Sequence, residues 1–218
     1  MKPVRLAILG LGTVGGGALK LLQENAAEIK RRTGREIQIT HVGTRRPRPD
    51  LNLEGIQQND DLMHIVRQPD VDVVVEVMGG IHPAYEVIME AIKHGKQVVT
   101  ANKALLAEHG NELFKAAEDN AVQIAYEAAV AGGIPIIKVI REGLAANHIQ
   151  WLAGIINGTG NFILTEMREK GRAFEDVLKE AQELGYAEAD PTFDVEGIDA
   201  AHKLTILASC AFGIPLQF

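Results

Sequence analysis

The sequence predicts an α/β protein built on a doubly wound parallel sheet, and two observations support this fold class. Up to Tyr126, short apolar runs alternate with longer stretches of helical periodicity. Strands that are separated by crossover helices pair in parallel and are covered by helices on both faces. The run Val71–Val77 is almost unbroken valine, which is typical of a central strand in such a sheet.

Each element of this part follows from a local pattern. Strands are indicated by short apolar runs and by an alternation through Ile37, Ile39 and His41. We expect strands at Val4–Leu9, Glu36–Val42, Val71–Val77, Gln97–Thr100 and Val122–Tyr126. Helices are indicated by apolar stripes and by end signals such as proline in the first turn and glycine after the last. We expect helices at Thr13–Arg32, Asp60–Val66, Pro83–His94 and Lys103–Asp119.

The pattern changes after Glu127, where a stretch of small residues and glycines leads into a region with more helix than strand. We expect helices at Pro135–Ala146, Asn161–Lys170, Phe174–Leu184 and Gly197–Phe212, and one strand at His148–Ile156. The sequence therefore predicts a doubly wound domain, residues 1–134, followed by part of an α+β domain, residues 135–218.

Composition excludes several classes of protein. The formal net charge is −7 and the longest basic run is Lys30–Arg32, so a nucleic-acid partner is not expected. The single cysteine, Cys210, allows no intrachain disulfide and favours the reducing cytoplasm. No signal-peptide pattern precedes Val4–Leu9, and the longest stretch without acidic or basic residues, 143–165, is too polar for a membrane. The histidines lack the spacing of zinc ligands.

The segment Gly10–Gly15 fits the pattern G-x-G-x-x-G, and it follows a strand and opens a helix. In a Rossmann-type fold, Gly10 permits the tight turn, Gly12 lets a pyrophosphate approach the backbone, and Gly15 lets helix and strand pack closely. The N–H groups of the helix N-terminus then face the phosphates. A glycine-rich turn without a ligand is the alternative interpretation.

The end of the second strand predicts which dinucleotide binds. NAD-binding sites usually carry an acidic residue there, whereas this strand is followed by Arg45 and Arg46. Guanidinium groups pair with phosphate oxygens, so these two arginines favour the 2′-phosphate of NADP(H), with NAD(H) as the alternative cofactor. The other interpretation is a solvated basic loop that also includes Arg48.

Lysine and carboxylate side chains supply candidates for chemistry. Lys103 follows the fourth strand, at the edge of the sheet where ligands bind. Asp199 and Lys203 lie four residues apart at the start of an apolar helix, and we read them as site residues rather than as a surface ion pair. The loop before this helix is acidic and is suited either to an ammonium group or to solvent; its carboxylates are Glu188, Asp190, Asp194 and Glu196. His202 is expected to be a packed histidine, and Cys210 a small core residue.

Together these residues resemble the homoserine dehydrogenase family over the whole chain. The segments that carry the resemblance are Gly10–Gly17, Thr100–Lys103, Tyr126–Pro135, Asn157–Asn161 and Gly197–Lys203. The resemblance implies NAD(P)H-dependent reduction of L-aspartate 4-semialdehyde to L-homoserine, on the route from aspartate to threonine and methionine. Gly160 stands where the family more often has a second threonine.

The resemblance also implies residue roles. The cofactor loop would comprise Gly10, Gly12, Thr13, Val14 and Gly15, and Lys103 would contact cofactor and substrate. A sodium ion would be held, largely through backbone carbonyls, at Glu127, Val130, Gly132 and Ile134. Substrate would bind at Gly185, Glu188 and Asp199, and Lys203 would donate the proton.

Two further expectations concern assembly and alternatives. Family chains continue past the position of Phe218 into the rest of the substrate domain and its dimer surface, so we expect a truncated chain whose complete form is a homodimer or larger. A phosphorylating semialdehyde dehydrogenase would require a thiolate, and Cys210 is the single candidate. A non-catalytic NADP sensor would leave Lys203 and the acidic loop with structural roles.

Overall fold

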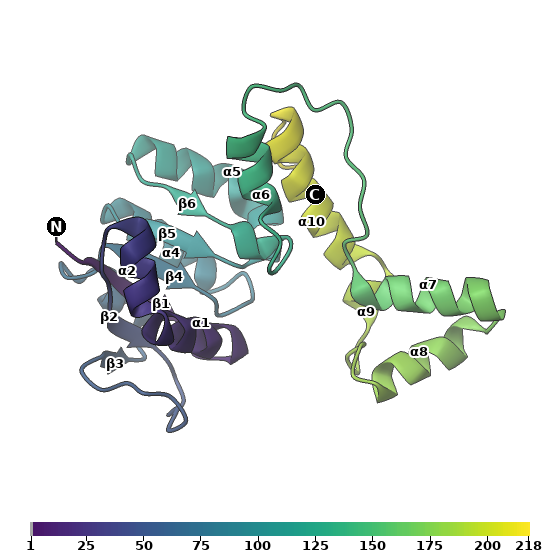
Figure 1. The fold of residues 1–218 in the computed structure, drawn as a ribbon, viewed down its shortest axis with the longest axis horizontal. Coiled ribbons are helices and arrows are strands. Elements are labelled where there is room, and N and C mark those ends of the chain that lie inside the picture. Colours follow the sequence, from purple (N-terminus) through teal and green to yellow (C-terminus); the bar gives the residue numbers. More distant parts are fainter. Residues whose placement is uncertain (1) are drawn as a thin grey trace. The chain divides into compact units, whose positions relative to one another are not determined.

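The computed structural model describes residues 2–218, which divide into two compact units (Figure 1). The N-terminal unit ends at Ala129, and the C-terminal unit comprises Val130–Phe218. Within the described residues, no helix combines the length and the apolar character needed to cross a membrane.

The N-terminal unit is built on a parallel sheet with the strand order β3-β2-β1-β4-β5-β6, which confirms the predicted doubly wound fold. The strands are β1 (Val4–Leu9), β2 (Ile37–Gly43), β3 (Gln57–Asn59), β4 (Val73–Glu76), β5 (Gln97–Thr100) and β6 (Ile124–Ala125). The order reverses between β1 and β4, and ligands of such sheets bind at this point, beyond the carboxyl ends of the strands. The edge strand β3 was not predicted from the sequence because Gln57–Asn59 contains no apolar residue.

Helices connect the strands of this unit: α1 (Thr13–Glu24), α2 (Ala26–Thr33), α3 (Leu62–Val66), α4 (Ala84–Lys93) and α5 (Lys103–Asp119). The prediction of one continuous helix over Thr13–Arg32 is wrong, because the chain leaves helical geometry at Asn25, with φ −105° and ψ 16°. Asn25 donates its side-chain amide to the carbonyl of Leu21, which favours an end to α1 there.

A buried aliphatic core fixes the first strand and its helix. Ile8, Leu9 and Leu19 are fully buried, and so are Ile65 of α3 and Ile88 of α4. Burying each such side chain contributes about 1.5–3 kcal/mol. At the other end of β1, the guanidinium of Arg5 forms two hydrogen bonds with the carboxylate of Asp72. Strand β1 is therefore held near both of its ends, and this fixes the start of the glycine loop that follows it.

In the C-terminal unit, all the regular secondary structure of the described residues is helical. Its helices are α6 (Ile136–Lys138), the π-helical turn η2 (Val139–Gly143), α7 (Gly158–Lys170), α8 (Phe174–Glu183), α9 (Thr192–Val195) and α10 (Ile198–Phe212). The helix predicted over Pro135–Ala146 is shorter than expected. The helix predicted from Asn161 begins earlier, at Gly158. The short α9 was not predicted.

The strand predicted at His148–Ile156 is not formed. Residues 148–157 have no regular secondary structure, and Trp151 and Ile155 are 75% and 78% exposed. The alternation of apolar residues describes one face of a strand, but a strand also requires a hydrogen-bonding partner. The described part of the C-terminal unit offers none. Helix α10 is also less buried than its apolar sequence indicates, since Leu204 and Phe212 are 48% and 42% exposed.

Candidate functional site

The loop between β1 and α1 has the geometry of a phosphate-binding turn. Gly10 has φ +96°, and a Cβ there would lie 2.9 Å from the carbonyl oxygen of Val77. A Cβ on Gly15 would lie 1.8 Å from the carbonyl oxygen of Gly10, so close packing requires glycine. At Gly12 nothing lies within 4 Å of the added carbon, and no side chain caps α1. The exposed backbone and the uncapped helix N-terminus fit a bound pyrophosphate.

The exposed start of α1 also carries Thr13 and Val14, the other two residues assigned to the cofactor loop. Both are exposed, and Val14 is 58% accessible. Their side chains therefore contribute little to the core, which is consistent with a loop that faces a ligand.

A buried carboxylate organises the neighbouring strand ends. Glu76, at the end of β4, is fully buried; it accepts the amide N–H of Met78 at 2.8 Å and the hydroxyl of Thr100 at 2.6 Å. The hydroxyl oxygen of Thr100 in turn accepts the amide N–H of Asn102 at 3.0 Å. The side chain of Asn102 donates to the carbonyl of Gly80 at 2.6 Å. This network links the loops after β4 and β5.

The same network positions Lys103. The Oδ1 atom of Asn102 accepts the amide N–H of Leu105 and caps α5, whose first residue is Lys103. Sequence reasoning missed Glu76, although an acidic residue at the end of a run of valines is an available signal for a functional carboxylate.

The arginines after β2 differ in their surroundings. Arg45 and Arg46 are exposed. Arg48 is 27% exposed and donates to the carbonyl of Gly12 at 3.3 Å. Its guanidinium also pairs with both carboxylate oxygens of Asp50, and this hydrogen bonding lowers the pKa of Asp50 to about 2. Arg48 is therefore the arginine of this segment that touches the glycine loop.

The residues assigned to sodium lie on both sides of the division between the units. Glu127 begins the 3-10 turn η1 (Glu127–Ala129) of the N-terminal unit. Val130, which is buried, and the exposed Gly132 and Ile134 belong to the C-terminal unit. Within residues 2–218, no three His, Cys, Asp or Glu side chains gather as a metal-binding group.

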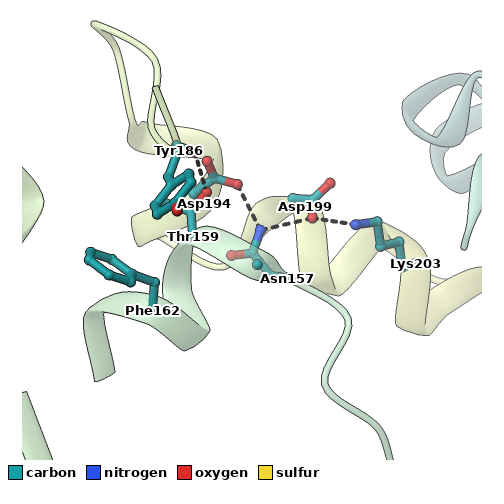
Figure 2. Close-up of a pocket in the computed structure, with 8 residues that line it drawn as sticks. Asn157, Thr159, Phe162, Tyr186, Asp194, Asp199 and Lys203 are labelled. Carbon is teal, nitrogen blue, oxygen red and sulfur yellow. Dashed lines mark hydrogen bonds and ion pairs between the residues drawn. The ribbon is translucent and has the colours of Figure 1, made fainter. Parts of the chain in front are cut away.

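A cavity of about 450 Å³ lies within the C-terminal unit (Figure 2). It is lined by backbone and side chains from α7, the α8–α9 connection, α9 and α10: Asn157, Gly158, Thr159, Phe162, Tyr186, Asp194, Asp199 and Lys203. The rings of Phe162 and Tyr186 meet edge to face at 5.2 Å. The cavity thus combines an aromatic wall with carboxylates and an ammonium group, a composition suited to a small zwitterionic molecule.

Asp199 and Lys203 form a partly buried ion pair at this cavity. The Nζ atom of Lys203 donates to Oδ2 of Asp199 at 2.7 Å and to the carbonyl of Ile156 at 2.7 Å. The side chains of Lys203 and Asp199 are only 19% and 11% exposed, so the pair is largely removed from water. An ammonium carries three N–H groups, and these two contacts leave one for a third acceptor.

Asn157 stands at the junction of the cavity walls. Its Oδ1 atom accepts the amide N–H of Gly160 at 2.6 Å and caps α7. Its Nδ2 atom donates to Oδ1 of Asp194 at 2.7 Å and to Oδ2 of Asp199 at 2.9 Å (Figure 2). The sequence offered Asn157 as part of a family motif without a role, and its partners lie far along the chain.

The other predicted substrate residues lie outside the cavity lining. Gly185 has φ +75°, just after the end of α8, and Glu188 is exposed, with its carbonyl accepting from Gln182 at 3.1 Å. Hydrogen bonds from Thr192 lower the pKa of Asp190. Of the four carboxylates in the acidic loop, Asp194 alone lines the cavity. His202 is buried beside aromatic rings, 4.2 Å from that of Phe218.

The sheet order and the open glycine loop define a dinucleotide-binding protein of the Rossmann type. Comparison with known families refines this class. Residues 10–127 match the family described as "Homoserine dehydrogenase, NAD binding domain", and residues 135–218 match "Homoserine dehydrogenase". The chain belongs to the homoserine dehydrogenase family.

Individual relatives agree with this assignment. The chain is 64% identical over 218 residues to a homoserine dehydrogenase of Pseudomonas aeruginosa and 59% identical over 225 aligned positions to one of Neisseria gonorrhoeae. In both cases the match covers all of this chain and 50% of the relative. The chain therefore spans about half the length of the curated relatives it matches.

Solved structures show the same relationship. A homoserine dehydrogenase from Thiobacillus denitrificans matches with a TM-score of 0.93 and 60% identity, over 100% of this chain and 51% of that one. A hyperthermophilic archaeal homoserine dehydrogenase in complex with NADPH matches with a TM-score of 0.85 and 30% identity, over 99% and 71% of the two chains.

Proposed function

We propose that the protein reduces L-aspartate 4-semialdehyde to L-homoserine with NADPH. The observation that carries this proposal is the Lys203 ammonium, held at the cavity by Asp199 and the Ile156 carbonyl. Residues 1–134 would form the dinucleotide-binding domain and residues 135–218 part of the substrate domain.

The cavity residues would provide the proton chemistry. When bound, the nicotinamide cofactor supplies the hydride that reduces the aldehyde carbon of the substrate. The third N–H of Lys203 would stabilise the oxygen as it gains negative charge and then protonate it. Asp199 would orient this ammonium through the hydrogen bond that it accepts from Nζ. Lys103 would contact both cofactor and substrate from the start of α5.

Substrate and cofactor selectivity rest on the remaining residues. Glu188 would bind the α-ammonium of the substrate, with Gly185 shaping the turn beside it. The cofactor loop has the open backbone at Gly12 that a pyrophosphate requires. The basic residues Arg45 and Arg46 favour the 2′-phosphate of NADPH over NADH.

Family resemblance adds two further proposals. A sodium ion would be held by Glu127 and the carbonyls near Val130, Gly132 and Ile134. The complete protein would be a cytoplasmic homodimer or larger assembly.

The experiment is NADPH oxidation with L-aspartate 4-semialdehyde, measured on residues 1–218 and on a form that extends beyond Phe218. Lys203→Ala should lower kcat by about 10²–10⁴-fold, because it removes the proton donor, while NADPH affinity measured by fluorescence stays the same. Lys170→Ala is a matched control, since this lysine lies at the end of α7, is 62% exposed and pairs with Glu166. A Lys203→Ala variant that keeps more than a tenth of the wild-type kcat would contradict the assignment.

The same assay distinguishes the alternatives. A phosphorylating semialdehyde dehydrogenase would need Cys210 as its nucleophile, and would reduce added NADP⁺ to NADPH as it oxidises the semialdehyde to an acyl phosphate in the presence of phosphate. Cys210 lies on α10 and does not line the cavity. A cofactor sensor would bind NADPH without turnover of any semialdehyde.

A further inference from the structure

Two aspartates of the cavity share one amide. Asp194 and Asp199 come from α9 and α10, and each accepts one hydrogen bond from Nδ2 of Asn157, at 2.7 and 2.9 Å. An amide nitrogen has two N–H donors, and both are used here. A neutral group thus holds two like charges side by side without adding a charge of its own.

The orientation of this amide is fixed by its surroundings. With the amide reversed, its oxygen would face two carboxylate oxygens, and its NH₂ group would face the N–H of Gly160. Each of these contacts would be repulsive, so one orientation alone satisfies every partner. The side chain of Asn157 therefore caps α7, connects the two carboxylates and lines the cavity.

The amide is also linked to the Lys203 ammonium through the carboxylate of Asp199. Oδ2 of Asp199 accepts from both Asn157 and Lys203, at 2.9 and 2.7 Å. The residue before Asn157 supplies the other acceptor of Lys203, the Ile156 carbonyl. Consecutive residues at the entrance to α7 therefore fix the carboxylate and the ammonium together.

We propose that Asn157 is a positioning residue, which sets the spacing of Asp194 and Asp199 and, through Asp199, the direction of the Lys203 ammonium. This inference rests on the proposed function of Lys203. Catalytic groups must be held within about half an ångström of their productive positions. Loss of the bridging amide should therefore slow proton donation more than it weakens substrate binding.

The informative variant is Asn157→Ser. Serine is as good a helix cap as asparagine, so α7 is retained, but its short hydroxyl cannot donate to both carboxylates. The hydrogen bond lost to a charged group predicts a fall in kcat of about 10- to 100-fold. We expect KM for the semialdehyde to change by less than about threefold, since the residues that bind it remain. Asn161→Ser, at an exposed position of α7, is the matched control.

Both variants and the wild-type protein are assayed in the same form. This form is residues 1–218, or the form that extends beyond Phe218 if it turns over faster. If wild-type protein shows no turnover of the semialdehyde, the proposed function fails. If wild-type protein is active and Asn157→Ser keeps kcat within twofold, or loses no more than Asn161→Ser, the positioning role alone is overturned. If Asn157→Ser does not fold, Asn157→Asp is used, because aspartate keeps the cap and the shape while removing both donors. An Asn157→Asp variant with wild-type kcat would overturn the role equally.

A second readout does not depend on turnover. The rate at which an amine-acylating reagent labels Lys203 can be followed by mass spectrometry, with Lys179 as an internal standard. Because Asn157 no longer holds the Asp199 carboxylate in place, Lys203 should be labelled several-fold faster in Asn157→Ser than in wild-type protein. An unchanged ratio of the two labelling rates would contradict the proposal.

Discussion

Alanine substitutions in the glycine loop should distinguish Gly15, which is needed for packing, from Gly12, which is needed for NADPH binding. In Gly15→Ala, the new Cβ would lie 1.8 Å from the carbonyl oxygen of Gly10, and both groups belong to backbone that cannot rotate away. Helix α1 and the loop would have to separate by more than about 1 Å, and overpacking of this kind costs about 3 kcal/mol. At about 2–4 °C per kcal/mol, the melting temperature should fall by roughly 6–12 °C.

Gly12→Ala should behave differently. Gly12 has φ −69°, which suits any residue, and its added Cβ meets nothing within 4 Å. The fold should therefore keep its melting temperature, whereas NADPH affinity should fall by at least about tenfold, because the methyl group occupies the approach to the pyrophosphate.

Gly17→Ala is the control for both substitutions. Gly17 is exposed within α1 and its Cβ would also meet nothing, so the higher helix propensity of alanine should stabilise the protein by about 1 kcal/mol. Thermal unfolding by circular dichroism and NADPH titration by fluorescence measure the two quantities. Equal melting temperatures for the Gly15 and Gly17 variants would refute the packing argument, and unchanged NADPH affinity in Gly12→Ala would refute the binding argument.

Three further predictions concern the cofactor, acid stability and self-association. Arg45→Asp should lower the affinity for NADPH more than the affinity for NADH in fluorescence titrations, because a carboxylate repels the 2′-phosphate. An unchanged ratio of the two affinities would contradict the assignment. Hydrogen bonding to Arg5 lowers the pKa of Asp72 from 3.8 to about 2, so this pair stabilises the fold above that range and the contribution is lost as the pH falls from 3.8 towards 2. Arg5→Ala should flatten that part of the stability–pH curve from urea unfolding, and a curve parallel to wild type would refute the coupling. Residues 1–218 should self-associate through the exposed Trp151 and Ile155 and turn over poorly; a strictly monomeric sample in sedimentation with full activity would count against this.

The sheet could be predicted from the sequence because its strands carry their own signal. A run such as Val71–Val77 is apolar without interruption, and such runs are buried on both faces in parallel sheets. The edge strand β3 lacked this signal, since its three residues are polar and its pairing depends on β2. The strand expected at His148–Ile156 failed for the opposite reason, because its pattern was present and its partner was not.

The candidate site was predictable only in part. Gly10, Gly12 and Gly15 are readable because their spacing is local: Gly10 and Gly15 have close backbone neighbours, and the open backbone at Gly12 suits a pyrophosphate. The role of Asn157 depends on distant parts of the chain, because its side chain donates to carboxylates 37 and 42 residues away. No short-range sequence pattern predicts such contacts. The acidic loop indicated an anionic site, but the folded chain decides that Asp194 lines the cavity and that Glu188 stays outside it.

The buried carboxylate of Glu76 has a consequence for hydrogen exchange. The amides of Met78, Asn102 and Leu105 donate to side-chain oxygens of Glu76, Thr100 and Asn102, rather than to a backbone ladder. Their protection from deuterium therefore depends on side chains, and because these side chains are joined to one another, the three amides should open as one cooperative unit. The connections that follow β4 and β5 would then exchange at a common rate, although residues 78 and 105 lie in different crossovers of the sheet.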